Sequence, residues 1–179
     1  MKRSVNAMTL GLCLVAAGCG YSATRLLPVN YRTIYVEPLE NKIPITDEIS
    51  EQHGFQTNLP RLEERTTQGI IDRFLFDGNL RVTTNRDQAD LVLKGALVDF
   101  NRQPLRRLDD ESVEEYRLNL AASLTVRDRQ GAIVWEENNL IGDTTYFVSG
   151  ASAKSETVAV DELITDLARR IVERTIENW

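Results

Sequence analysis

Residues 116–127 carry the pattern that most restricts the fold, because their side chains alternate between two faces over the whole segment. Apolar side chains occupy one face: Tyr116, Leu118, Leu120, Ala122, Leu124 and Val126. The other face is mainly polar: Arg117, Asn119, Ala121, Ser123, Thr125 and Arg127. A period of two is typical of a β-strand with one buried face. We therefore expect this segment in a sheet that is covered on one side.

Four further segments are predicted strands. Residues 32–37 alternate and are rich in β-branched side chains, and residues 80–83 form a short strand. Residues 90–100 are apolar on both faces, which predicts a central position in the sheet, with Gly95 as a candidate bulge. Residues 132–146 return antiparallel after the tight loop 128–131, with Ile133 and Trp135 facing inward. Residues 39–57 and 101–113 are predicted loops.

Helical periodicity appears twice. Residues 59–77 form a helix with Asn58 as its cap and Pro60 in its first turn, and the helix stops at Asp77-Gly78-Asn79. The C-terminal helix has one apolar face, made of Val160, Leu163, Ile164, Leu167 and Ile171. The order of elements predicts an α+β, two-layer sandwich, in which two helices pack on one face of a four- to five-stranded mixed, mostly antiparallel sheet. Residues 32–179 are predicted to form this single domain.

The composition limits the chemistry. The chain has 179 residues, 42% of them hydrophobic, and a formal net charge of −6, which suits a folded protein and argues against a general nucleic-acid binder. His53 is the one histidine, so the chain has too few His and Cys side chains to form a His-rich metal site or a Cys–His nucleophile. We therefore expect no catalytic residue, metal or cofactor. The carboxylates before the fourth strand are predicted to lie on a solvated loop rather than in a hydrolase cleft: Asp109, Asp110, Glu111, Glu114 and Glu115.

The N-terminus resembles a bacterial lipoprotein signal. Residues 1–18 combine a short basic start with a short apolar stretch, and Ala16-Ala17-Gly18 precede Cys19. We expect cleavage before Cys19, acylation of its thiol and new N-terminus, and a tether over residues 19–31. An ordinary secretory signal with a chance cysteine is the alternative. By analogy with lipoprotein sorting, Gly20 favours the outer membrane.

Cleavage would also change the charge and the cysteine content. The signal holds two of the 21 basic residues and none of the 27 acidic ones, so the mature net charge is 19 − 27 = −8. Cys13 leaves with the signal and Cys19 carries the lipid, so we expect no disulfide in the mature chain.

Four arginines flank the boundary between the third and fourth predicted strands: Arg102, Arg106, Arg107 and Arg117. A hairpin places these strand ends together, and guanidinium groups bind phosphates and carboxylates in a two-pronged manner. On a membrane-anchored protein, we therefore expect these arginines to contact lipid headgroups. The alternative is local pairing with the neighbouring carboxylates.

Several segments, in order, resemble the LptE family of lipopolysaccharide-assembly lipoproteins. They are Gly18-Cys19-Gly20-Tyr21, Thr33-Ile34-Tyr35-Val36-Glu37-Pro38 with Glu40-Asn41, Phe76-Asp77-Gly78, Ala89-Asp90-Leu91-Val92-Leu93-Lys94-Gly95, Gly131-Ala132-Ile133-Val134-Trp135 and the C-terminal helix. The family's glycine-rich segment after the tether is missing, since residues 22–31 contain no glycine, and the loop 42–57 is longer than expected.

The resemblance implies a non-enzymatic lipoprotein, anchored in the outer membrane and facing the periplasm or the lumen of an LptD-type β-barrel. Such a protein assists assembly of that barrel and transport of lipopolysaccharide to the outer leaflet. It implies no particular binding residue. Taken together with the arginine spacing, it predicts that Arg102, Arg106, Arg107 and Arg117 contact lipopolysaccharide or an acidic wall of the barrel lumen. Two other classes stay open: another periplasmic scaffold or accessory lipoprotein for secretion or cell-wall synthesis, and a lipid-modifying or hydrolytic enzyme.

Overall fold

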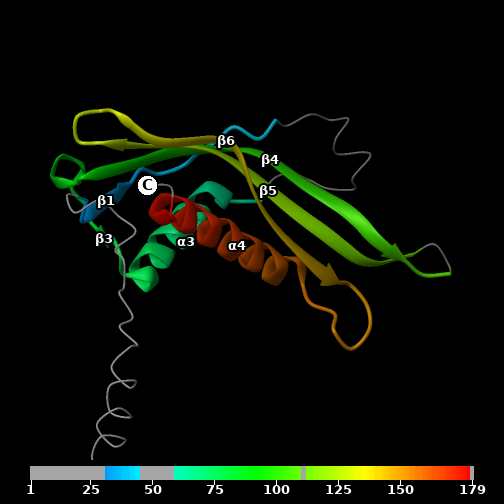
Figure 1. Cartoon of the computed structure of the whole chain (residues 1–179). Helices are drawn as coiled ribbons and strands as arrows, with labels where there is room; N and C mark the ends of the chain where they lie inside the picture. The colour runs from blue at the N-terminus through cyan, green and yellow to red at the C-terminus, as the bar shows by residue number, and fades with distance from the viewer. Residues whose placement is uncertain (1–30, 45–58, 110–111, 178–179) are drawn as a thin grey trace, which may run out of the picture.

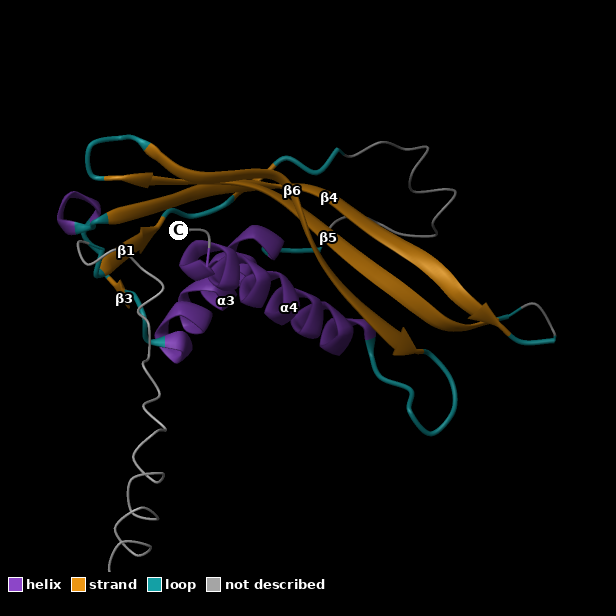
Figure 2. Cartoon of the chain, viewed as in Figure 1, coloured by secondary structure: helices purple, strands orange, loops and turns teal. Residues whose placement is uncertain are grey.

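The computed structural model describes residues 31–44, 59–109 and 112–177. Two helices, α3 (Leu62–Asp77) and α4 (Glu156–Glu177), lie on one face of a mixed β-sheet (Figures 1 and 2). The strands are β1 (Thr33–Val36), β2 (Glu40–Asn41), β3 (Arg81–Val82), β4 (Leu91–Arg107), β5 (Val113–Asp128) and β6 (Ile133–Phe147), and a short 3-10 helix, η2, covers Arg86–Gln88. The predicted two-layer α+β architecture is confirmed.

The sheet has six strands in the order β3-β1-β4-β5-β6, with β2 paired to β4 off this path. The pairs among β1, β2, β3 and β4 are parallel, whereas β4, β5 and β6 form an antiparallel meander. The predicted central position of residues 90–100 is confirmed, because β4 pairs with both β1 and β5. The sixth strand is β2, a two-residue strand in a segment predicted to be a loop.

The predicted two faces of β5 are confirmed. Leu118, Leu120 and Val126 are fully buried under the helices, whereas Arg117 and Arg127 are exposed on the other face. The predicted apolar face of α4 is buried as well, including Leu163, Leu167 and Ile171. One hydrophobic cluster joins these residues to Ile34 of β1 and Phe74 of α3.

α4 lies unusually close to β6. A methyl group at Gly142 would lie 2.6 Å from Cβ of Leu167 and 2.8 Å from its backbone nitrogen, so only glycine fits there without displacement. Asp166 of α4 accepts a hydrogen bond from the Asp143 amide at 3.0 Å and pairs with Arg170 at 2.7 Å. Burial alone would raise the pKa of Asp166, but the Asp143 amide and the arginines beside it outweigh that effect and lower the pKa. The carboxylate therefore remains charged and ties the helix to the sheet.

The predicted loop over residues 101–113 is wrong in its first half, because β4 continues to Arg107. Residues 113–119 of β5 supply backbone partners along this extension, and its charged side chains can be solvated because the extension projects past the helices (Figure 2). The bulge lies at Val98, where the register shifts between Leu97 and Asp99, and not at Gly95. The extra residue inverts the alternation, so Phe100 returns to the buried face. Gly95 is instead a close approach, since a Cβ there would lie 2.5 Å from the Ser123 carbonyl oxygen.

Two other local predictions need correction. Trp135 is buried as predicted, but Ile133 is 51% exposed, because a register shift places Trp135 opposite Val126 and Ile133 opposite Arg127. Helix α3 begins at Leu62 rather than at residue 59; Arg61 occupies the cap position with φ 60° and makes no side-chain capping bond. Asn58 lies outside the described residues. The predicted end at Asp77 is confirmed, with Gly78 at φ 75° donating its amide to the Phe74 carbonyl.

The register of β5 can be tested by truncating one residue on each face. Leu120→Ala should lower the free energy of unfolding by about 2–5 kcal/mol, because a fully buried side chain leaves a cavity. Arg117→Ala is the matched control on the exposed face and should change it far less. Urea denaturation of both variants measures the difference, and equal losses would contradict the assigned register.

Candidate functional site

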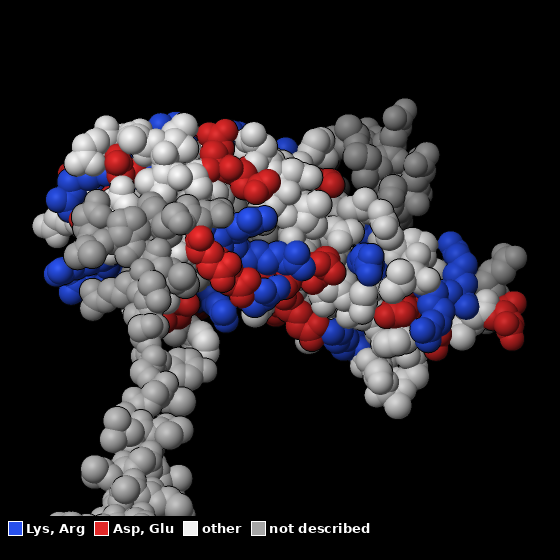
Figure 3. All heavy atoms as spheres, viewed as in Figure 1, with Lys and Arg blue, Asp and Glu red and all other residues white. Residues whose placement is uncertain are grey.

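The four arginines predicted as a contact site lie in the outer half of the β4–β5 hairpin. We call residues 101–108 and 113–119 the hairpin tip. Its register places Arg102 opposite Leu118, Gln103 opposite Arg117, Arg106 opposite Glu115 and Arg107 opposite Val113. Basic and acidic side chains are interspersed at this end of the molecule (Figure 3). The hairpin therefore brings the arginines to one end of the sheet, but it divides them between its two faces.

Arg102 faces the helix layer rather than solvent. Its guanidinium carbon lies 3.5 Å from the centre of the Tyr116 ring, and its Nη1 lies 3.6 Å from Oε2 of Glu156. Only 15% of the Arg102 side chain is exposed. Glu156 is the first residue of α4, so this interaction joins the hairpin tip to the start of the helix. Arg102 therefore has a structural role. We call the contact made by Arg102, Tyr116, Tyr146 and Glu156 between the sheet and α4 the seam.

Two tyrosines complete the seam. The Tyr116 and Tyr146 rings stack with centres 5.8 Å apart, and the Tyr146 hydroxyl donates to Oε2 of Glu156 at 3.2 Å. Burial raises the pKa of Tyr146 to about 12; the charge of Glu156 adds to this, while the charge of Arg102 opposes it. Tyr146 therefore stays neutral and keeps its donor. The other carboxylate oxygen of Glu156 is buried without a hydrogen bond from any described residue.

The remaining arginines of the tip are exposed. Arg106 lies 3.7 Å from Glu114 and 3.9 Å from Glu115, so the local pairing considered from the sequence is present at this residue. Its guanidinium also lies 5.7 Å from the centre of the Phe147 ring. Arg107 and Arg117 are exposed, and Arg117 lies on the face away from the helices.

Apolar side chains are exposed between these charges. Leu105 is 49% exposed, Leu108 is 43% exposed and Val148 is 41% exposed. Val148 lies beside the tip, where its amide donates to the Glu114 carbonyl. The sequence analysis did not single out Leu105 and Leu108, because residues 101–113 were predicted to form a charged loop. The tip therefore presents arginines together with apolar side chains, which is the combination that an anionic amphiphile requires.

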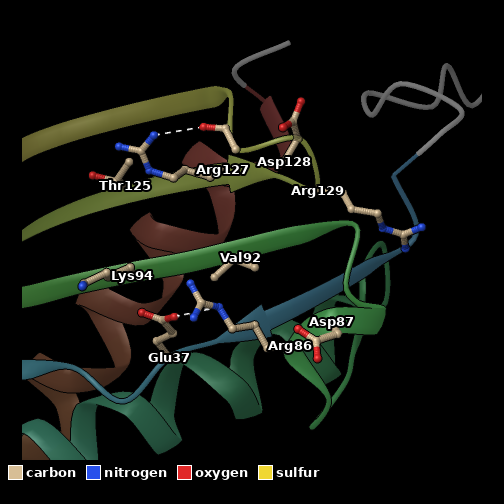
Figure 4. Close-up of a pocket in the computed structure, with 10 residues that line it drawn as sticks. Glu37, Arg86, Asp87, Val92, Lys94, Thr125, Arg127, Asp128 and Arg129 are labelled. Atoms are coloured by element: carbon tan, nitrogen blue, oxygen red, sulfur yellow. Dashed lines mark hydrogen bonds and ion pairs between the residues drawn. The ribbon is translucent and has the colours of Figure 1, made fainter.

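A second candidate is an open concavity of about 690 Å³ at the other end of the sheet (Figure 4). Its lining comes from Glu37, which follows β1, and from η2, β4, β5 and the β5–β6 turn. Arg86 pairs with Glu37 at 3.1 Å, Arg127 donates to the Gly131 carbonyl at 3.0 Å, and Asp128 accepts from the turn amides of Gln130 and Ala132 at 2.9 Å. The lining carboxylates of Glu37 and Asp128 are thus already engaged within the fold.

Other sequence candidates have plain outcomes. His53, Cys19, Asp110 and Glu111 lie outside the described residues. Among the residues that the structure describes, no group of three or more His, Cys, Asp or Glu side chains could hold a metal ion. In the same part of the chain, no helix combines the length and apolarity needed to cross a membrane.

The fold and tip define a small α+β domain whose distinctive surface is suited to binding. A family model described as "LptE: Lipopolysaccharide-assembly" matches residues 31–175. The match covers most of the chain, so this protein belongs to the LptE family, and its role lies in lipopolysaccharide assembly as a lipoprotein of the cell envelope. No curated protein matches the sequence.

Solved structures with a similar fold have low sequence identity. A hypothetical protein from Chlamydia trachomatis is 12% identical, with a TM-score of 0.52 over 81% of this chain and 95% of that chain; this likeness shows the fold alone. A minor lipoprotein from Acinetobacter baumannii is 18% identical, with a TM-score of 0.49 over 83% of this chain and 94% of that one. Rare lipoprotein B from Shewanella oneidensis is 16% identical, with a TM-score of 0.46 over 79% and 92%.

The structural role of Arg102 leads to a prediction about stability. Arg102→Ala should lower the free energy of unfolding by about 1–3 kcal/mol, because it leaves the largely buried Glu156 carboxylate without its cation. Thermal and urea denaturation measure the loss. Adding Glu156→Gln should recover part of it, since the double variant no longer buries a lone charge. Equal stability of wild type and Arg102→Ala would show that the seam contributes nothing.

Proposed function

We propose that this protein is an outer-membrane lipoprotein, anchored through acylated Cys19, that assists assembly of an LptD-type β-barrel and transport of lipopolysaccharide to the outer leaflet. The observation that carries the proposal is the family match over residues 31–175. The barrel partner, the membrane and the lipid anchor are parts of the proposal. In this role the protein acts by binding and not as an enzyme.

The shape of the sheet supports a two-ended arrangement. Ile34 of β1 pairs with Leu91 at the start of β4, so the chain enters the domain at the end of β4 opposite to Arg107. A lipid on Cys19 would therefore tether one end of the sheet, while the hairpin tip extends from the other. We assign the lipopolysaccharide contact to the exposed part of the tip, where Arg106, Arg107 and Arg117 meet the phosphates and Leu105 and Leu108 meet apolar parts. Arg102, the fourth predicted residue, instead contacts Tyr116 and Glu156 on the helix side of the tip.

The lipid anchor can be tested at one residue. Cys19→Ala should leave the protein unlabelled by radioactive palmitate and release it into the soluble periplasmic fraction, because acyl chains supply the membrane affinity. Labelling and fractionation of cells measure both effects. Retention of the unlabelled variant in the membrane would contradict a lipid anchor and indicate a protein one.

The partner and the tip can be tested together. A crosslinked pull-down from solubilised outer membranes should recover an LptD-type barrel with the wild-type protein. Arg107→Ala with Arg117→Ala should weaken binding of purified lipopolysaccharide several-fold at unchanged thermal stability, because both side chains are exposed. Lys42→Ala, an exposed cation away from the tip, is the control.

The outcomes separate the candidate functions. Recovery of a different periplasmic assembly would favour the scaffold or accessory role in secretion or cell-wall synthesis. Unchanged lipopolysaccharide binding by the double variant would remove the tip as its contact site while leaving the barrel partnership intact.

A further inference from the structure

The last turn of α3 presents an apolar surface that the fold does not use. Phe76 is 81% exposed and Leu75 is 60% exposed, although the preceding Phe74 is fully buried. Arg73 lies beside them, with its guanidinium carbon 5.3 Å from the centre of the Phe76 ring. The Nε of Arg73 is buried and has no hydrogen-bond partner among the described residues. We call Arg73, Leu75 and Phe76 the helix-end surface.

The helix-end surface lies where the chain enters the domain. After Asp77 the chain turns at Gly78 into β3, where the Arg81 amide donates to the Arg32 carbonyl at 2.9 Å. The end of α3 and the starts of β1 and β3 therefore share one end of the molecule (Figure 1). The helix-end surface is thus far from the hairpin tip, which lies at the opposite end of β4.

The length of the tether limits how far this end can lie from a membrane. Eleven residues separate Cys19 from Tyr31, and the twelve backbone steps between them allow a reach of at most about 40 Å. β4 alone has 17 residues and spans about 55 Å at roughly 3.3 Å per residue. A lipid on Cys19 therefore keeps the entry end close to the bilayer, whereas the tip can stand well away from it.

The charges at this end also suit a lipid surface. Among the described residues, no carboxylate lies within ion-pair distance of the Arg32, Arg73 or Arg81 side chains. Three nearby acids accept hydrogen bonds within the fold: Asp72 from the Gln68 side chain at 2.8 Å, Asp77 from the Asn79 side chain at 2.8 Å, and Asp90 from the Arg32 and Thr33 amides at 3.0 Å. Asp90 also pairs with Arg129 at 2.9 Å. This end therefore offers available cations next to exposed apolar groups, although the whole chain is acidic.

We propose that the helix-end surface docks on the membrane that holds the lipid anchor, with Leu75 and Phe76 in the interface and Arg73 at the lipid phosphates. Aromatic and aliphatic side chains enter the boundary between headgroups and acyl chains, and arginine binds the phosphate above them. Two apolar residues bind a free bilayer weakly, but the tether holds them at a high effective concentration. The proposal rests on the Cys19 anchor of the proposed function and adds a second contact between the entry end and the bilayer.

The test places a fluorophore on the surface of the purified, acylated protein in vesicles of phosphatidylethanolamine and phosphatidylglycerol. Phe76→Cys provides the only reactive thiol in the mature chain when Cys19 is acylated. Ile141→Cys is the matched control, since Ile141 is apolar and 41% exposed on the sheet. An environment-sensitive label at position 76 should shift to shorter wavelength and be quenched by nitroxides placed about 5–10 Å below the headgroups. The label at position 141 should remain unquenched.

Flotation of the same vesicles separates the two proposals. Flotation with equal, solvent-like signals at positions 76 and 141 would overturn membrane docking and leave the anchor standing. A wavelength shift at position 76 without quenching by lipid nitroxides would also overturn it, because a protein would then cover the surface. Absence of flotation would overturn the anchor, and the docking that depends on it.

Discussion

The fold depends on burying one apolar face of the antiparallel strands β4, β5 and β6 under helix α4, and these strands are longer than the helix. β4 has 17 residues and spans about 55 Å, whereas α4 has 22 residues and spans about 33 Å at 1.5 Å per residue. The helix is held against the sheet by Gly142, where no side chain separates it from Leu167, and by the charged contacts of Asp166. Because the helix cannot reach the end of these strands, part of the hairpin must project without a cover.

The seam at Arg102 marks where the cover stops. Leu118 and Leu120 are fully buried on the covered side, and beyond them Arg102, Tyr116 and Glu156 close the layer with polar groups. A buried charge is tolerated only where it is paired, and here the cation comes from the sheet and the anion from the first residue of the helix. The seam therefore permits the exposed tip beyond it to carry arginines and leucines without exposing the core to water.

The same geometry gives the molecule two functional ends. The parallel pairing of β1 with β4 places the entry of the chain at one end, and the antiparallel pairing of β4 with β5 places the tip at the other. Under the proposed function, the entry end lies at the membrane, and the tip contacts lipopolysaccharide or a barrel partner. The exposed Phe76 at the entry end and the exposed Leu105 at the tip are separated by the length of the sheet.

The sequence by itself determined the faces of β5, the buried face of α4, the central place of β4 and the end of α3 at Gly78, because alternation, helical periodicity and a left-handed glycine are local signals. It also carried the resemblance to the family that the match confirmed. Only the tertiary structure decided that residues 101–107 extend β4, since those charged residues form a strand through partners in residues 113–119. It likewise decided that the Ile133 side chain is exposed and that the Arg102 side chain is largely buried, unlike the other arginines of the tip. Bulges and cross-strand contacts depend on which backbone lies opposite, and that information is absent from any local pattern.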